Sequence, residues 1–176
     1  MGSFGLGGIA KTTLAKELFD RKRSHYKVST FLSNVRENAN KSSLTSLQSQ
    51  LLKRLTGANL LIDNIDKGNE ELKKYLSSYP ILVILDDVDH RSQIDALLPT
   101  RTDLRSDSLL VITSRNKEVI SLGVENATIY KLTRLNEKYS RKLFCTYAFN
   151  QPYPIAGYES LVDNIFESCD GLPLFL

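Results

Sequence analysis

Gly5-Leu-Gly-Gly-Ile-Ala-Lys-Thr-Thr13 lies near the start of this chain of 176 residues and leads into a helical pattern. Its three glycines, Gly5, Gly7 and Gly8, carry no side chains, so successive backbone N–H groups can curve around an anion. The amino end of the following helix adds a partial positive charge, and Lys11 adds a full one. The stretch therefore predicts a loop that binds phosphate groups.

This loop follows the P-loop pattern G-x-x-x-x-G-K-[ST] at all but one position. In that pattern the lysine reaches the β- and γ-phosphates, and the hydroxyl of Thr12 binds Mg²⁺. Ala10 stands in place of the second glycine. An ordinary turn beside a solvated lysine is therefore an alternative interpretation of the loop.

Ile81-Leu-Val-Ile-Leu85 is a short apolar run that is bounded by Pro80 and followed by Asp86-Asp87. Such a run, rich in branched residues, is typical of a buried parallel strand. Open α/β sheets bind their ligands at the carboxyl ends of their strands. We expect Asp86 to bind Mg²⁺ through water and Asp87 to orient or deprotonate an attacking water. The alternative is that both carboxylates cap a turn or a helix.

A further apolar strand is predicted at Leu109-Leu-Val-Ile-Thr113, and Ser114-Arg115 follows it. The strand brings Arg115 to the same edge of the sheet. The fixed fork of donors on a guanidinium suits the end of a triphosphate, so we expect Arg115 to contact the γ-phosphate. An ion pair with a neighbouring carboxylate such as Glu118 is the alternative.

Further stretches share the order and spacing of a known family. They are Phe31-Leu-Ser-Asn-Val-Arg-Glu37, Leu82-Val-Ile-Leu-Asp-Asp-Val-Asp89, Ile112-Thr-Ser-Arg115, Tyr130-Lys-Leu-Thr-Arg-Leu-Asn136 with Leu143-Phe-Cys-Thr-Tyr-Ala-Phe149, and Gly171-Leu-Pro-Leu-Phe-Leu176. With the phosphate loop, they resemble the nucleotide-binding (NB-ARC) region of plant disease-resistance receptors that carry leucine-rich repeats. The stretch from Leu82 ends in Asp89, and in this it resembles the branch of the family that has an N-terminal TIR domain. The resemblance covers essentially the whole chain, with Ala10 and Phe175 as departures.

The resemblance implies an ADP/ATP-binding switch, in which ADP holds the resting form and exchange for ATP releases the active one. At most weak ATP hydrolysis resets the switch, with Asp87 as the catalytic residue and with Thr12 and Asp86 as the Mg²⁺ ligands. The residues placed on the nucleotide are Gly5, Gly7, Gly8, Ile9, Ala10, Lys11, Thr12, Thr13, Arg115 and Pro173. The resemblance places Pro173 near the adenine, and the alternative is that it only stops the preceding helix.

Two other functions stay open at this point. One is a continuously active ATPase or related STAND-type regulator, and the other is a degenerate interaction scaffold that binds no nucleotide. For the full-length protein the resemblance implies an N-terminal TIR domain, C-terminal leucine-rich repeats, self-association on activation, and a cytoplasmic or nucleocytoplasmic location.

The composition is that of a compact domain, with 41% hydrophobic and 24% charged residues. The 23 basic residues exceed the 20 acidic ones by a net charge of +3 and are scattered, apart from Arg21-Lys-Arg23, which we expect to be a solvated helix end. This balance argues against a nucleic-acid partner. No apolar run has the length that a bilayer requires. Cys145 and Cys169 are expected to be reduced core residues.

The pattern predicts an α/β fold with a P-loop NTPase-type parallel sheet flanked by helices, followed by the start of a helical ARC subdomain. Residues 1–132 form the predicted nucleotide-binding domain, N-terminally truncated, and residues 133–176 the first helical ARC subdomain, incomplete. Because only Met1 to Phe4 precede the loop, we expect the first strand of the sheet to be missing and the chain to be a fragment of a longer receptor. The predicted strands are 28–32, 81–85, 109–113 and 128–132, and the predicted helices of the first domain are 11–23, 43–57, 70–76, 92–98 and 116–122, with Gly57 and Gly123 as terminators.

Overall fold

The computed structural model describes residues 1–99, 104–169 and 171–175, and these group into two compact units. One unit contains Met1–Gly5 and Lys11–Lys131, and the other contains Leu6–Ala10 and Leu132–Leu176. Leu176, the last residue of one of the family stretches, lies outside the described residues.

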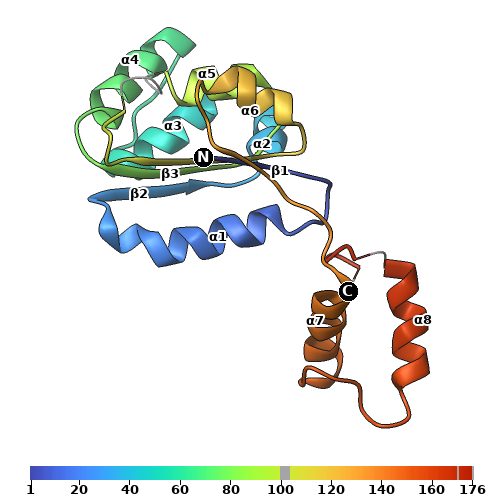
Figure 1. Cartoon of the computed structure of the whole chain (residues 1–176). Helices are drawn as coiled ribbons and strands as arrows, with labels where there is room; N and C mark the ends of the chain where they lie inside the picture. The colour runs from blue at the N-terminus through green and yellow to red at the C-terminus, as the bar shows by residue number, and fades with distance from the viewer. Residues whose placement is uncertain (100–103, 170, 176) are drawn as a thin grey trace. The chain divides into compact units, whose positions relative to one another are not determined.

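The first unit is built on a sheet of five strands in the order β2-β3-β4-β1-β5 (Figure 1). All its strand pairs are parallel. The strands are β1 Gly2–Phe4, β2 Val28–Leu32, β3 Ile81–Val88, β4 Leu109–Ser114 and β5 Ile129–Lys131. The four predicted strands are present, and the α/β fold class is confirmed.

The prediction that the sheet lacks its first strand is wrong. β1 lies between β4 and β5 and pairs with both. The amino group of Met1 donates to the carbonyl oxygen of Leu110 at 2.9 Å, and its carbonyl oxygen accepts from the N–H of Ile112 at 3.2 Å. Three residues form a strand here because neighbours on both sides satisfy their backbone groups. A Cβ atom at Gly2 would lie 2.5 Å from the side chain of Ile120, so only glycine fits at this position without a shift.

Helices cover both faces of this sheet. They are α1 Lys11–Lys22, α2 Val35–Lys41, α3 Leu44–Thr56, α4 Ile65–Leu76, α5 Arg91–Leu97 and α6 Lys117–Gly123. α1 lies on one face, and the larger core with α2–α6 lies on the other (Figure 1). Because successive side chains of a strand point to opposite faces, Leu82 and Ile84 of β3 pack against Ala15 of α1, while the alternate residues belong to the larger core.

Local sequence signals explain several helix ends. The Ser43 hydroxyl accepts from the N–H of Ser46 at 3.1 Å, and Gly57 ends α3 with a left-handed φ of 77°, as predicted. Gly123, in contrast, is not a terminator, because α6 includes it and Val124 is the C-cap. Its small size serves packing instead, since a Cβ atom there would lie 2.4 Å from the Ile94 side chain. Helix α2 was not predicted.

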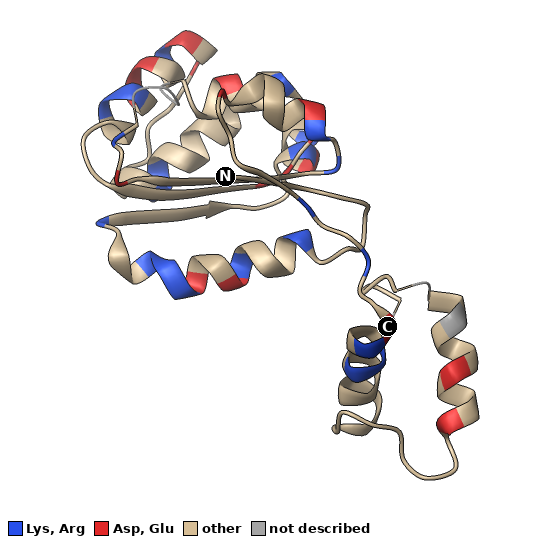
Figure 2. Cartoon of the chain, in the orientation of Figure 1, with Lys and Arg blue, Asp and Glu red and all other residues tan. Residues whose placement is uncertain are grey.

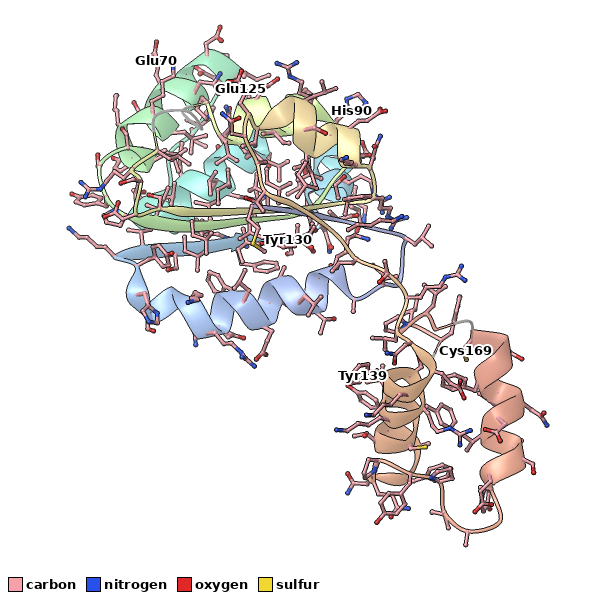
Figure 3. All side chains as sticks on the ribbon, in the orientation of Figure 1. Glu70, His90, Glu125, Tyr130, Tyr139 and Cys169 are labelled. Carbon is pink, nitrogen blue, oxygen red and sulfur yellow. The ribbon has the colours of Figure 1, made fainter. Side chains whose placement is uncertain are left out.

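The second unit contains two helices, α7 Glu137–Phe149 and α8 Glu159–Cys169. An ion pair between Arg141 and Asp163 joins them. The ring of Phe149 contacts those of Phe144 and Tyr158, with centroids 6.2 and 6.0 Å away. Cys145 and Cys169, the second labelled in Figure 3, are buried free thiols, as predicted.

Candidate functional site

The carboxyl end of β3 carries a β-bulge. Between Leu85 and Val88, β3 contains one residue more than the facing stretch of β4. Asp87 lies in this bulge with a left-handed φ of 56°, a conformation that costs a non-glycine residue about 1–3 kcal/mol. Its N–H donates to Oγ1 of Thr113 at 2.9 Å, so a side chain of the neighbouring strand fixes the bulge.

Asp86 is fully buried and is held by two hydroxyls. Oγ1 of Thr113 donates to Asp86 Oδ1 at 2.6 Å, and Oγ1 of Thr12 lies 3.0 Å from both carboxylate oxygens. These oxygens suit Mg²⁺, which takes one or two protein ligands and completes its shell with water and phosphate oxygens. Among the described residues there is no cluster of three or more metal-binding side chains, so the residues fit such a shared site and not an all-protein cage. Asp86 caps neither a turn nor a helix.

Lys11, the first residue of α1, is only 8% exposed, which excludes the alternative of a solvated lysine. Its Nζ donates to the carbonyl oxygen of Gly5 at 2.7 Å. Burial lowers the pKa of Lys11, and the guanidinium of Arg115 lowers it further, whereas the Asp87 and Asp86 carboxylates raise it. The ammonium of Lys11 is therefore in the field of every charged group predicted for the site.

Two arginines bind the Asp87 carboxylate. Arg36 of α2 places Nη2 3.0 Å from Oδ2, and Arg115 places Nε 3.5 Å from Oδ1. The alternative of a neighbouring carboxylate partner for Arg115 is thus realised, by Asp87 of the adjacent strand. With Lys11 near them, three cations meet two carboxylates among the described residues at this edge of the sheet, and their excess positive charge favours an anion.

The rest of the glycine-rich loop belongs to the second unit. Gly8 and Ala10 both have left-handed φ angles, 78° and 67°. The carbonyl oxygen of Gly8 accepts from the N–H of Leu174 at 3.2 Å, and a Cβ atom at Gly8 would lie 2.9 Å from the Leu174 side chain. The other predicted loop contacts differ in exposure: Gly7 and Thr13 are exposed, and Ile9 is buried.

Pro173 is half-buried in a turn beyond the end of α8. The helix ends at Cys169, and Gly171, with a φ of 67°, lies between the two. A Cβ atom at Gly171 would lie 2.5 Å from the carbonyl oxygen of Leu135, so this position requires glycine. The predicted contact of Pro173 with adenine stays a prediction.

Sequence reasoning assigned no role to Thr113 or Arg36. Both lie inside family-like stretches quoted above, Phe31 to Glu37 and Ile112 to Arg115. A threonine that ends a buried strand next to a strand ending in two aspartates could have been proposed as their partner, whereas no local signal links Arg36 to residue 87.

The basic run at the end of α1 is paired on the surface. Arg21 lies 2.6 Å from Glu17, and Arg23 lies 3.7 Å from Asp20, each between side-chain N and O atoms. Figure 2 shows basic and acidic residues interleaved along this helix. Both observations favour a solvated helix end. Within the part of the chain that the structure describes, no helix is both long and apolar enough to cross a bilayer.

Comparison with known proteins gives concordant matches. The family model for the NB-ARC domain matches residues 1–153. The chain is 35% identical over 178 residues to disease resistance protein RUN1 of Vitis rotundifolia and 33% identical over 183 residues to TMV resistance protein N of Nicotiana glutinosa. Both alignments include all of this chain, which spans 13% and 16% of the length of those proteins.

One solved structure with a similar fold is a signal transduction ATPase with numerous domains (STAND protein) with a tetratricopeptide repeat sensor, from Pyrococcus horikoshii. It superposes with a TM-score of 0.53 and 17% sequence identity, over 98% of this chain and 26% of that one. At this identity the similarity concerns the fold.

Proposed function

Since the chain belongs to the NB-ARC domain family, we propose that it binds ADP and ATP as the switch segment of a plant immune receptor. In the proposed cycle the ADP-bound form is inactive and the ATP-bound form signals. Slow hydrolysis of ATP restores the ADP-bound form. The observation that carries the proposal is the meeting of Thr12 with Asp86, residues 74 positions apart, at the edge of the sheet where Lys11 is buried.

Each residue of the site has a role in this proposal. Lys11 neutralises charge on the β- and γ-phosphates, and Thr12 and Asp86 supply oxygen ligands to Mg²⁺. Arg115 binds the γ-phosphate, and Asp87 orients the attacking water. A γ-phosphate can shift a conformational equilibrium only through contacts that ADP lacks, and Arg115 makes such a contact. The Gly5 to Thr13 loop and Pro173 complete the proposed nucleotide contacts.

The proposed context is the full-length receptor. We assign nucleotide binding to residues 1–132 and the first helical ARC subdomain to residues 133–176. The relatives are resistance proteins of which this chain spans a small part, so a TIR domain before it, leucine-rich repeats after it, self-association on activation and a cytoplasmic location belong to the same proposal. Asp89 supports the TIR branch, and its Oδ1 accepts from Gln93 at 2.7 Å at the start of α5.

Calorimetric titration with ADP and with ATP, both with Mg²⁺, tests the proposal. Lys11→Ala should weaken both ligands by roughly tenfold to a hundredfold, because charged hydrogen bonds contribute about 1.5–3 kcal/mol. Lys16→Ala is the matched control, since Lys16 is exposed on the same helix. Equal affinities of the wild type and Lys11→Ala would contradict the assignment of the phosphate loop.

The same protein distinguishes the competing functions. ADP that co-purifies with the chain and exchanges slowly supports the switch. Continuous ATP turnover supports an ATPase, and a site that takes up neither nucleotide supports an interaction scaffold.

A further inference from the structure

Arg36 is a charged residue at this site to which the proposed function assigns no role. It is the second residue of α2, and its side chain is one-third exposed, against 54% for Arg115. Its distance to the Asp87 carboxylate is the shorter of the two, 3.0 Å against 3.5 Å. Arg36 therefore makes the closer and better shielded ion pair with Asp87.

Rigid elements hold both ends of this pair. α2 is anchored by Val35, which is fully buried in the core beneath it. Asn34, just before the helix, has a left-handed φ of 53°, and the Asn38 side chain donates to the Ser33 carbonyl oxygen at 3.0 Å. At the other end, Asp87 is fixed in its bulge by the hydrogen bond to Thr113. Left-handed non-glycine residues persist only where their surroundings determine them, so this geometry is imposed by the fold.

Arg115 has a competing demand that Arg36 lacks. Its charge acts on Lys11, and in the proposed function, on which this inference rests, it binds the γ-phosphate. A guanidinium on a phosphate can no longer serve the Asp87 carboxylate with the same donors. Arg36 remains to pair with Asp87.

We propose that Arg36 sets the preference of the site for ATP over ADP, because it holds the Asp87 carboxylate and so releases Arg115 to the γ-phosphate. Without Arg36, Arg115 is the arginine that remains on Asp87 among the described residues, and moving it to the phosphate leaves the carboxylate without either of these two arginines. Arg36 is thus a positioning residue that acts on the triphosphate through Asp87.

Titration of the chain with ADP and with the non-hydrolysable analogue AMP-PNP, both with Mg²⁺ at low ionic strength, tests this proposal. Arg36→Gln should raise the Kd of AMP-PNP roughly two- to fivefold and leave that of ADP nearly unchanged. Asp87→Asn alone should lower the Kd of AMP-PNP, since it frees Arg115. Arg36→Lys should restore most of the preference.

The decisive measurement is the double substitution. In the Asp87→Asn background, Arg36→Gln should no longer change the Kd of AMP-PNP, because no carboxylate is left to hold. The matched control is Arg91→Gln, which breaks an Arg91–Asp95 pair of 3.4 Å at the start of α5 and should leave both affinities unchanged.

Two results would overturn the inference while leaving nucleotide binding intact. One is an equal loss of ADP and AMP-PNP in Arg36→Gln, which indicates a structural role, and the other is an undiminished effect of Arg36→Gln in the Asp87→Asn background. A wild-type chain that binds neither ligand would instead overturn the proposed function, and the inference with it.

Discussion

Replacing Ala10 by glycine should stabilise the protein. Ala10 has a φ of 67°, and a left-handed conformation costs an L-residue with a side chain about 1–2 kcal/mol. Glycine removes this cost, but it also gains conformational freedom in the unfolded chain, which lowers the unfolding free energy by about 0.4–1 kcal/mol. The net expectation is a gain of about 0.5–1 kcal/mol in unfolding free energy. For a chain of this size that corresponds to a rise in Tm of about 1–4 °C.

Scanning calorimetry with and without ADP is the assay. If the free loop keeps the left-handed conformation, the gain appears in Tm and the ADP affinity stays the same. If the free loop relaxes and is strained only when it binds, the gain appears in affinity instead, as a decrease in Kd of up to about fivefold. Either result is consistent with strain at Ala10.

The matched control removes the same methyl group from a right-handed helix. Ala39 lies within α2, where alanine to glycine costs about 1 kcal/mol, so Ala39→Gly should lower Tm. The two substitutions should therefore act with opposite signs. A fall in Tm for Ala10→Gly similar to that for Ala39→Gly would refute the argument, because it would mean that Ala10 is not strained.

Three further results are expected. Asp87→Ala should still bind ATP but should hydrolyse it more slowly in single-turnover measurements. Asp86→Asn should weaken only the Mg²⁺-dependent part of ATP binding. The same behaviour of both variants would contradict the proposed roles. Thr113→Val, which removes two hydrogen bonds to the aspartates, should cost about 2 kcal/mol in urea unfolding, and Thr113→Ser should restore it. Because burial and Arg115 lower the pKa of Lys11, ADP affinity should fall as the pH rises through that lowered value, where the phosphate-binding ammonium is lost. In calorimetric titrations, Arg115→Gln should shift this decrease in ADP affinity to higher pH. A decrease at unchanged pH would exclude deprotonation of Lys11 as its cause.

Residues with strong local patterns allowed the sheet to be predicted. The apolar runs of β3 and β4 are long and rich in branched side chains, and Ser43 and Gly57 have the side chains that helix ends require. β1 and α2 were missed for a physical reason. Gly2–Phe4 is too short to show a periodicity, and its strand conformation depends on β4 and β5. α2 is likewise anchored by burial of Val35, a tertiary contact.

The candidate site divides in the same way. Lys11, Thr12, Asp86 and Arg115 could be proposed because the carboxyl ends of parallel strands share one edge of a sheet. Thr113, at the end of the neighbouring strand, could have been proposed as a partner of the aspartates, but Arg36 could not, since it acts from a helix that is distant from Asp87 in sequence. The sequence showed that Ala10 departs from the loop pattern, but its left-handed φ angle could not be predicted from the sequence.

The two aspartates that end β3 illustrate what the fold adds to the pattern. Adjacent residues of a strand point to opposite faces, and here Asp86 contacts Thr12 of α1 while Asp87 contacts Arg36 of α2, helices that cover opposite faces of the sheet. In the proposed function, Asp86 would share Mg²⁺ with Thr12 of α1, whereas Arg115 turns from Asp87 to the γ-phosphate and leaves Asp87 to Arg36 of α2. Mg²⁺ can accompany either nucleotide, but only ATP brings the γ-phosphate. The difference between ADP and ATP therefore reaches α2 through Asp87, and a substitution that uncouples Arg36 from Asp87 should remove this response without removing the nucleotide.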